Sequence, residues 1–363
     1  MLHQCEKLFV IEIVADVSLM AALRILDACS NRAAEGLRTM EEFARFVLED
    51  RHLTEVAKQL RHDLRAAVET VPLAERLLAR AVTSDCGTTI QTHSERHRAD
   101  TTSVLQAAIG RTQESLRCIE EYGKMIDGLD AQRVESIRYR TYTLAAALAL
   151  TPSRVTRLRE ARLYLLMPCE EDSERFAGRV QSLFESGVDI VQLRDKHASD
   201  RQLYHCARIA ADIARRLDRC FIVNDRADIA AAVHAAGVHL GQDELPVEAA
   251  RRIVGGGQLI GVSTHTIEQA RAAVLDGADY IGCGPTFTST TKSFDAFPGL
   301  AFLREVATEI SLPAFAIGGI EEDAVATVMQ TGIHGIAVAS AILHAEHPLE
   351  AAGRLRQQIS PPR

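Results

Sequence analysis

The sequence contains no tryptophan, and aromatic residues make up only 5% of its 363 positions. It also has no Cys-x-x-Cys pair, because its eight cysteines are scattered, and this argues against a zinc site and a disulfide framework. We therefore expect reduced thiols and a cytoplasmic protein. In the first 150 residues, the loop 83–89 is rich in small polar residues but lacks the GxxxxGK[ST] spacing, so a P-loop nucleotide site is not supported.

Long apolar runs and excess positive charge are missing as well. The apolar stretches 8–14 and 144–150 are too short to span a bilayer, so we expect no membrane partner. The net charge of −8 argues against nucleic acid as the main partner, and an anionic substrate therefore needs a local group of cations. The length suffices for two domains. The oligomeric state is left open, a homo-oligomer included.

Residues 24–150 follow a helical pattern, with apolar side chains at steps of three and four. Within this region the segment 26–45 aligns without gaps on 105–124, an offset of 79 residues. Such a repeat predicts a pseudo-symmetric, all-α helical bundle in which the two copies pack together. Arginine and glutamate lie three apart in both copies, as in Arg38 and Glu41, and we interpret most of these residues as a salt-bridged surface.

After position 150 the pattern changes to short apolar runs separated by helical stretches. The eight runs are 163–167, 189–193, 220–224, 237–240, 259–263, 280–284, 314–318 and 335–339. Eight βα units in about 200 residues predict an α/β fold of the (β/α)8 TIM-barrel type, with a doubly wound sheet as the alternative. We thus predict a helical domain at 1–150, a linker at 151–160 and a barrel at 161–363.

Polar side chains follow the predicted strands, at the end where barrels bind their ligands. Gln192, Arg194 and Lys196 alternate toward one side after the second run and suit a diphosphate. Ser263 ends the fifth run, and the hydroxyl-rich loop 284–292 closes with Lys292. Together these residues predict a cationic pocket for a phosphorylated small molecule.

Two carboxylates occur at the same end of neighbouring predicted strands. Asn224 and Asp225 follow the third run, and Glu244 follows the fourth. Hard oxygen ligands, one or two at a time, suit Mg²⁺ that carries a substrate phosphate. An N-cap followed by a solvated loop is the other interpretation of this stretch.

A second anion pocket is predicted after the seventh and eighth runs, at Gly319 and at Ala339 and Ser340. Backbone N–H groups at these two strand ends form the usual phosphate site of such barrels. No nucleophile, triad or acid–base dyad stands between the two pockets. This favours a reaction in which diphosphate departs and a second phosphorylated molecule attacks, with the protein supplying charge and position.

Several segments resemble thiamine-phosphate synthase in order and spacing, over residues 162–358. They are VQLRDK (191–196), VNDRADIA (223–230), GVHLGQDE (237–244), GVSTH (261–265), the GP…TTK loop (284–292), AIGGI (316–320) and VASAI (338–342). The resemblance implies that 4-amino-2-methyl-5-hydroxymethylpyrimidine diphosphate and thiazole phosphate give thiamine phosphate and pyrophosphate. The implied route passes through a pyrimidinylmethyl cation.

The resemblance also implies a role for each matching position. The pyrimidine diphosphate is assigned to Gln192, Arg194, Lys196, Asn224, Ser263 and Lys292. The thiazole phosphate is assigned to Ser289, Thr291, Gly319, Ala339 and Ser340, and Mg²⁺ to Asp225 and Glu244. Glu244 stands where the family usually has aspartate, and Ser289 where it usually has threonine, so neither change removes a needed group.

Two alternatives stay open. The helical segment resembles the domain fused ahead of some family members and suggested to act as a pyrimidine-phosphate kinase, but its residues equally fit an interaction or oligomerisation module. For the barrel, the second hypothesis is a thiazole-phosphate tautomerase that uses His265 as its proton shuttle. That enzyme does not need the two carboxylates or the cation cluster, which this chain retains.

Overall fold

The structure is a computed structural model, and it describes residues 2–80, 85, 97–287 and 298–359, with the side chains of 2–16 left out. The chain divides into two compact units, Met1–Ala149 and Leu150–Arg363. None of the described helices is long and apolar enough to cross a membrane. The six cysteines whose side chains the structure describes are free thiols.

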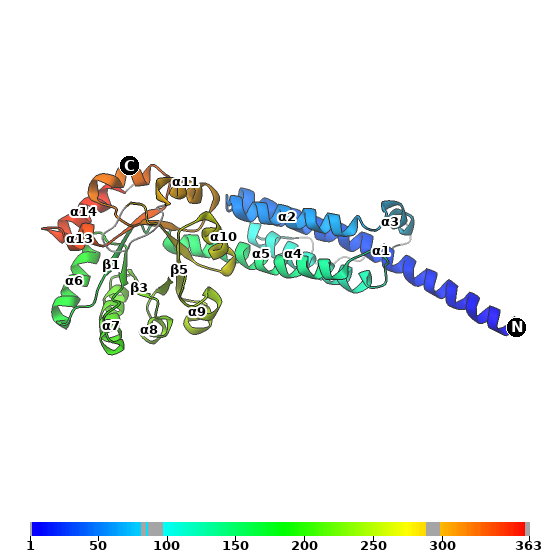
Figure 1. The fold of residues 1–363 in the computed structure, drawn as a ribbon, viewed down its shortest axis with the longest axis horizontal. Coiled ribbons are helices and arrows are strands. Elements are labelled where there is room, and N and C mark those ends of the chain that lie inside the picture. Colours follow the sequence, from blue (N-terminus) through cyan, green and yellow to red (C-terminus); the bar gives the residue numbers. More distant parts are fainter. Residues whose placement is uncertain (1, 81–84, 86–96, 288–297, 360–363) are drawn as a thin grey trace. The chain divides into compact units, whose positions relative to one another are not determined.

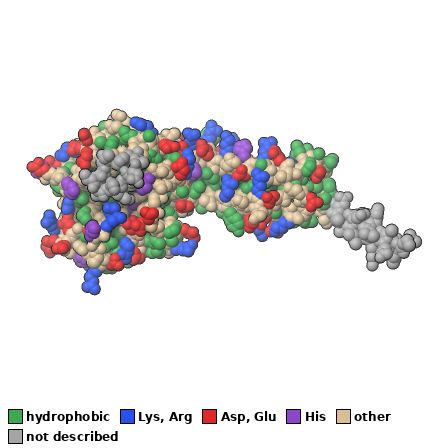
Figure 2. Space-filling view, in the orientation of Figure 1, with side chains coloured by type: hydrophobic (Ala, Val, Ile, Leu, Met, Phe, Trp, Pro, Cys, Tyr) green, Lys and Arg blue, Asp and Glu red, His purple; other side chains and the backbone are tan. Residues whose placement is uncertain are grey.

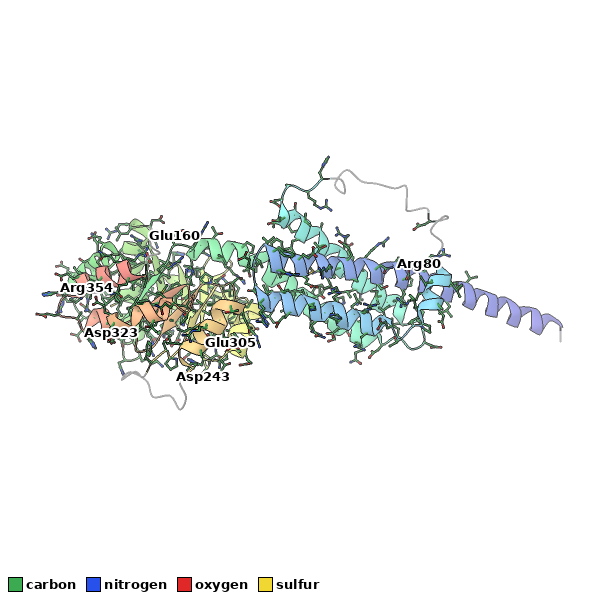
Figure 3. The ribbon with its side chains drawn as sticks, turned by 90° about the horizontal axis from the view of Figure 1, so that it is seen from above. Arg80, Glu160, Asp243, Glu305, Asp323 and Arg354 are labelled. Atoms are coloured by element: carbon green, nitrogen blue, oxygen red, sulfur yellow. The ribbon has the colours of Figure 1, made fainter. Side chains whose placement is uncertain are left out.

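The first unit is a set of helices (Figure 1). They are α1 (Leu2–Phe46), α2 (Arg51–Val68), α3 (Leu73–Ala79), α4 (Thr101–Gly123) and α5 (Ala131–Leu158). Asp50 starts α2 by accepting a hydrogen bond from the Leu53 N–H, and Asp100 starts α4 through a capping box with Ser103. Arg80, labelled in Figure 3, follows α3. Its guanidinium reaches Asp27 of α1, with Nε 2.5 Å from Oδ2.

The two copies of the repeat lie on α1 and α4, which pack closely together as predicted. A Cβ added to Gly36 would lie 2.0 Å from Thr112 Oγ1 and 3.0 Å from the Ala108 carbonyl oxygen, so glycine permits this approach. Arg111 joins the same two helices, with its guanidinium 3.2 Å from Glu35 Oε2. The repeated helices thus form the centre of the bundle.

Ion pairs of the repeat are partly buried, which corrects the prediction of a salt-bridged surface for Glu41 and Glu120. These two side chains are only 6% and 5% exposed. Each carboxylate binds two arginines: Glu41 binds Arg38 at 3.2 Å and Arg61 at 3.1 Å. Glu120 likewise binds one arginine of its own helix and one of α5. The second arginine comes from another helix, which a spacing along one helix cannot reveal.

The segment 151–160, expected to be a linker, is mostly helical because α5 continues through Pro152 to Leu158. Proline removes one helical hydrogen bond, yet contacts within the second unit compensate for it. Arg154 is buried and its Nε lies 2.9 Å from Asp279 Oδ1. Leu158 is 2% exposed and belongs to the apolar cluster inside the barrel.

The second unit is a closed barrel of eight parallel strands in sequence order, as predicted. The strands are β1 (Leu163–Met167), β2 (Ile190–Leu193), β3 (Cys220–Asn224), β4 (Gly237–Leu240), β5 (Leu259–Thr264), β6 (Tyr280–Cys283), β7 (Ala314–Ile317) and β8 (Gly335–Val338). Pairing of β1 with β8, Tyr164 opposite Ala337, closes the barrel. Each strand lies within one residue of its predicted ends at both termini.

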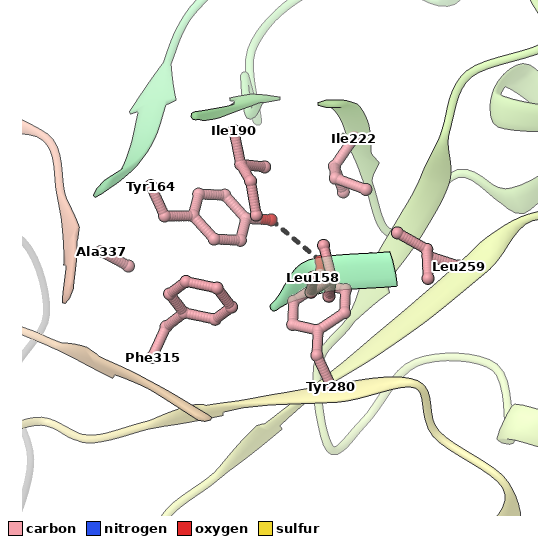
Figure 4. Packing of buried hydrophobic residues seen from close by; sticks show 8 residues of the cluster. All are labelled: Leu158, Tyr164, Ile190, Ile222, Leu259, Tyr280, Phe315 and Ala337. Atoms are coloured by element: carbon pink, nitrogen blue, oxygen red, sulfur yellow. Dashed lines mark hydrogen bonds between the residues drawn. The ribbon is translucent and has the colours of Figure 1, made fainter. Parts of the chain in front are cut away.

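Helices follow the strands and form an outer layer around them (Figure 1). They are α6 (Ser173–Glu185), α7 (Asp200–Arg216), α8 (Ala227–Ala232), α9 (Val247–Val254), α10 (Ile267–Asp276), α11 (Gly299–Glu309), the 3-10 turn η3 (Glu322–Ala324), α12 (Val325–Met329), α13 (Ser340–Leu343) and α14 (Pro348–Gln358). Inside the barrel an apolar cluster includes Ile190, Ile222, Leu259 and three aromatic rings (Figure 4). This cluster forms the floor of the site described next.

Candidate active site

One cavity of about 310 Å³ lies at the carboxyl ends of the barrel strands. Its floor is aromatic, with Tyr164, Tyr280 and Phe315 from β1, β6 and β7. Figure 2 shows acidic and basic side chains interspersed on the visible face of the chain, so selective binding of an anion has to come from local groups.

The structure brings four residues assigned to the pyrimidine diphosphate to this cavity. Gln192 of β2 and Arg194 just after it line the wall, as do Asn224 of β3 and Ser263 of β5. The Arg194 backbone N–H donates to the Met167 carbonyl at 2.8 Å, which continues the pairing of β2 with β1. The predicted alternation of Gln192 and Arg194 toward one side is therefore observed.

Three residues assigned to the thiazole phosphate line the same cavity: Gly319, Ala339 and Ser340. Gly318 and Gly319 follow β7 with φ angles of 99° and 64°, in the left-handed region that favours glycine. A Cβ on Gly318 would also lie 2.8 Å from Pro285 Cβ. Seven predicted site residues thus surround one space, from five different strand ends.

Other predicted residues do not line the cavity. Lys196 and Glu244 are exposed, and Asp225 is half-buried directly after Asn224. Ser289, Thr291 and Lys292 lie outside the described residues, so their predicted roles are not tested.

The donor set at Asp225 and Glu244 fits Mg²⁺ in its chemistry. Within the described residues, no group of three or more histidine, cysteine or acidic side chains could enclose a metal. Mg²⁺ needs no such group, because it binds one or two carboxylates and completes its shell with water and phosphate. Neither carboxylate forms a hydrogen bond or ion pair with another described residue, so both are free to bind a cation.

His239 of β4 is a site residue that the sequence analysis quoted within a motif but did not assign. Its ring lines the cavity, with Nδ1 3.2 Å from the Tyr280 hydroxyl and Nε2 3.0 Å from Ser263 Oγ. Burial, and after it the positive charge of Arg194, lower the pKa of His239 to about 4. The ring is therefore neutral at pH 7. A histidine within a four-residue apolar strand was the signal that could have identified it.

His265, the proton shuttle of the alternative tautomerase, also lines the cavity. Its Nδ1 lies 2.5 Å from the Gly284 carbonyl oxygen, and its backbone N–H donates to Gln269 at 2.7 Å. One ring nitrogen is thus engaged by the backbone.

Comparison with known proteins separates the two hypotheses for the barrel. A family model described as thiamine monophosphate synthase matches residues 163–342, and a ThiD2 family model matches residues 24–147. The thiamine-phosphate synthase of Rhodopirellula baltica is 50% identical over 329 residues, covering 88% of each chain. The chain belongs to the thiamine-phosphate synthase family.

Further similar proteins carry related names. The thiamine-phosphate synthase of a Synechocystis species is 39% identical over 348 residues, which cover 94% of this chain and 97% of that protein. A solved thiamine phosphate pyrophosphorylase from Pyrococcus furiosus is 35% identical, with a TM-score of 0.49, and covers 55% of this chain and 95% of that one. The matches to the relatives from Rhodopirellula and Synechocystis extend over both units. This agrees with the resemblance of the helical segment to the domain fused ahead of some family members.

Proposed function

We propose that the barrel joins 4-amino-2-methyl-5-hydroxymethylpyrimidine diphosphate to thiazole phosphate and releases thiamine phosphate and pyrophosphate. The observation that carries this proposal is the meeting of seven assigned residues around one cavity of about 310 Å³. Family membership supplies the reaction type. We infer a cytoplasmic enzyme with small phosphorylated substrates, and the free thiols of the described chain accord with a reducing compartment.

The first step breaks the bond between the pyrimidinylmethyl carbon and its diphosphate oxygen, and the electron pair leaves with pyrophosphate. Arg194 offers a planar, permanently charged group to the diphosphate oxygens, and Lys196 and Lys292 are proposed to add charge. Asp225 and Glu244 would hold Mg²⁺, which would supply further positive charge for the leaving diphosphate. Stabilising the departing charge lowers the barrier to ionisation.

The second step forms the bond between the thiazole nitrogen and the pyrimidinylmethyl carbon. Gly319, Ala339 and Ser340, with Ser289 and Thr291, are proposed to hold the thiazole phosphate so that its ring nitrogen faces the cation. The cavity floor of aromatic and aliphatic side chains limits the water that competes for the cation. No protein nucleophile is required.

The metal assignment is tested by Asp225→Ala. We expect loss of Mg²⁺-dependent pyrophosphate release with the barrel still folded, because no described residue depends on this carboxylate for a hydrogen bond or ion pair. The φ angle of 61° at this position should cost the alanine variant about 1 kcal/mol in free energy of unfolding. Asp212→Ala, which removes an exposed carboxylate of α7, is the control and should keep full turnover. Undiminished release in the Asp225 variant contradicts the assignment.

For the helical unit, the ThiD2 match favours a phosphoryl-transfer role on the pyrimidine monophosphate over a purely structural module. The full chain carrying Asp225→Ala should then still convert ATP and pyrimidine monophosphate to the diphosphate, because the change lies in the barrel unit. Absence of this conversion in both the variant and the unmodified chain assigns the unit to interaction or oligomerisation instead.

A further inference from the structure

We propose that a one-way chain of hydrogen bonds runs through the barrel from Gln192 to Ser263 and makes Tyr164, Tyr280 and His239 positioning residues of the reaction. Through this chain the amide orientation at one end fixes which group donates at the other. The identity of the ligand rests on the proposed function, whereas the direction of the chain does not.

The chain consists of four contacts that cross the barrel interior. Gln192 Nε2 lies 2.9 Å from the Tyr164 hydroxyl. The Tyr164 hydroxyl lies 2.9 Å from the Tyr280 hydroxyl, the contact drawn as a dashed line in Figure 4. Tyr280 lies 3.2 Å from His239 Nδ1, and the opposite ring nitrogen lies 3.0 Å from Ser263 Oγ. Residues of β2, β1, β6, β4 and β5 are thereby connected in one series.

With the Gln192 amide nitrogen placed at Tyr164, only one direction satisfies all four contacts. An amide NH₂ can only donate, so Gln192 donates to the Tyr164 hydroxyl. That hydroxyl has one proton, which it therefore donates to the Tyr280 hydroxyl. Tyr280 then donates to His239 Nδ1. Because a neutral imidazole carries one N–H, His239 donates from Nε2 to Ser263.

Proton counts along the chain support this direction. Burial raises the pKa of Tyr164 and of Tyr280 well above the ordinary value, so both hydroxyls keep their protons. His239 accepts at Nδ1 and donates from Nε2, so it too carries a single ring proton. Each intermediate member therefore has one proton to give and one lone pair to receive with.

The barrel backbone is built to accommodate these rings. A Cβ on Gly261 of β5 would lie 2.1 Å from Tyr280 Cζ and 2.5 Å from His239 Nδ1. A Cβ on Gly282 of β6 would lie 3.3 Å from His239 Cε1. Glycine at these two inward positions leaves the space in which the phenol and imidazole meet.

The two ends of the hydrogen-bond chain differ in role: Gln192 offers an acceptor and Ser263 offers a donor. Gln192 lines the cavity and is 2% exposed, and its Oε1 is buried without a hydrogen-bond partner in the described structure, so one acceptor beside the cavity is left unsatisfied. Ser263, which accepts from His239, keeps its own O–H to donate. These ends suit an amino-substituted heterocycle at Gln192 and a phosphate oxygen at Ser263.

A flipped Gln192 amide would reverse every bond. Tyr164 would donate to Oε1, His239 would carry its proton on Nδ1, and Ser263 would donate to His239. Ser263 would then face the diphosphate only as an acceptor, and Gln192 would offer an NH₂ group to the exocyclic amine. Neither Gln192 nor Ser263 could then form its hydrogen bond with the ligand. Tyr164, Tyr280 and His239 therefore affect binding by fixing which groups donate at the two ends.

The direction is tested by ¹⁵N NMR of the full-length protein with labelled histidine, with the His239 signal assigned by its loss in His239→Gln. We expect His239 protonated on Nε2 alone. In Tyr280→Phe, which keeps the ring and removes the donor to Nδ1, the preference for this tautomer should be lost. His239 protonated on Nδ1, or on both nitrogens, at pH 7 overturns the proposal whether or not the enzyme turns over.

The positioning role is tested by kinetics with the same variants. Tyr164→Phe and Tyr280→Phe should raise KM for the pyrimidine diphosphate roughly tenfold or more and leave KM for thiazole phosphate unchanged, because the mismatch lies at the Gln192 and Ser263 ends. Tyr204→Phe, on the exposed face of α7, is the matched control and should change neither value. Equal KM values in Tyr280→Phe and the unmodified enzyme overturn the positioning role.

Discussion

At the scale of single residues, the barrel depends on histidines that stay neutral. His334, directly before β8, packs edge-on against Phe315, with ring centroids 5.5 Å apart. A nitrogen of the Arg162 guanidinium lies 2.8 Å from its Nε2. Burial, and after it the charge of Arg162, lower the pKa of His334 to about 4. Protonation of this ring is therefore unfavourable in the folded barrel.

This shift predicts destabilisation by acid. The unfolded chain takes up a proton at the ordinary histidine pKa of 6.5, whereas folded His334 does so only near 4. Between these values the unfolded state binds more protons, so the free energy of unfolding decreases as the pH falls, by roughly 3 kcal/mol at most. Urea unfolding at pH 7.5, 6, 5 and 4 should show a weaker pH dependence for His334→Gln than for the unmodified chain.

His344→Gln, which makes the same substitution at an exposed histidine of the barrel unit, is the matched control. Identical slopes for the His334 variant and the unmodified protein would show that this ring titrates normally.

The site residues differ in how far the sequence alone could predict them. The motif positions Gln192, Arg194 and Asn224 could be assigned from the sequence, but the connection of His239 to Tyr280 depends on strand pairing between distant segments.

At the scale of elements, the eight strands were predictable because each is a short apolar run bounded by polar residues or glycine. Two features of the helices were not. Helix α5 continues past Pro152 because Arg154 and Leu158 are buried within the second unit. Glu41 is buried because Arg61 of α2 reaches it. The continuation of α5 and the burial of Glu41 both depend on contacts with other elements. The pattern of apolar residues within one segment cannot predict such contacts.

The approach of α1 to α4 predicts opposite effects for two glycines. Gly36→Ala should lower the free energy of unfolding of the helical unit by roughly 1–3 kcal/mol, because the new methyl group meets Thr112 and the Ala108 carbonyl. Gly110→Ala on α4 is the control: its Cβ meets nothing within 4 Å, so better helix propensity should raise stability by up to about 1 kcal/mol.

Denaturant unfolding followed by the circular dichroism of the helices measures both changes. Equal stability of the two variants would mean that α1 and α4 do not approach each other at Gly36. The interface between the two copies of the repeat would then lie elsewhere.

At the scale of the whole chain, relatives of similar length carry both units, and the family model of each unit matches a separate segment. The cavity and all residues assigned to the substrates and Mg²⁺ belong to the barrel unit, and we propose that the condensation takes place there. The chain divides between Ala149 and Leu150. We propose a separate activity for each unit, phosphoryl transfer for the first and the condensation for the second.

The most direct test is the product balance of the full-length protein incubated with the pyrimidine diphosphate, thiazole phosphate and Mg²⁺. We predict that pyrophosphate and thiamine phosphate appear in equal amounts and that removal of Mg²⁺ by a chelator stops both. Pyrophosphate without thiamine phosphate, or an altered thiazole phosphate without any pyrophosphate, would contradict the condensation proposed for this cavity.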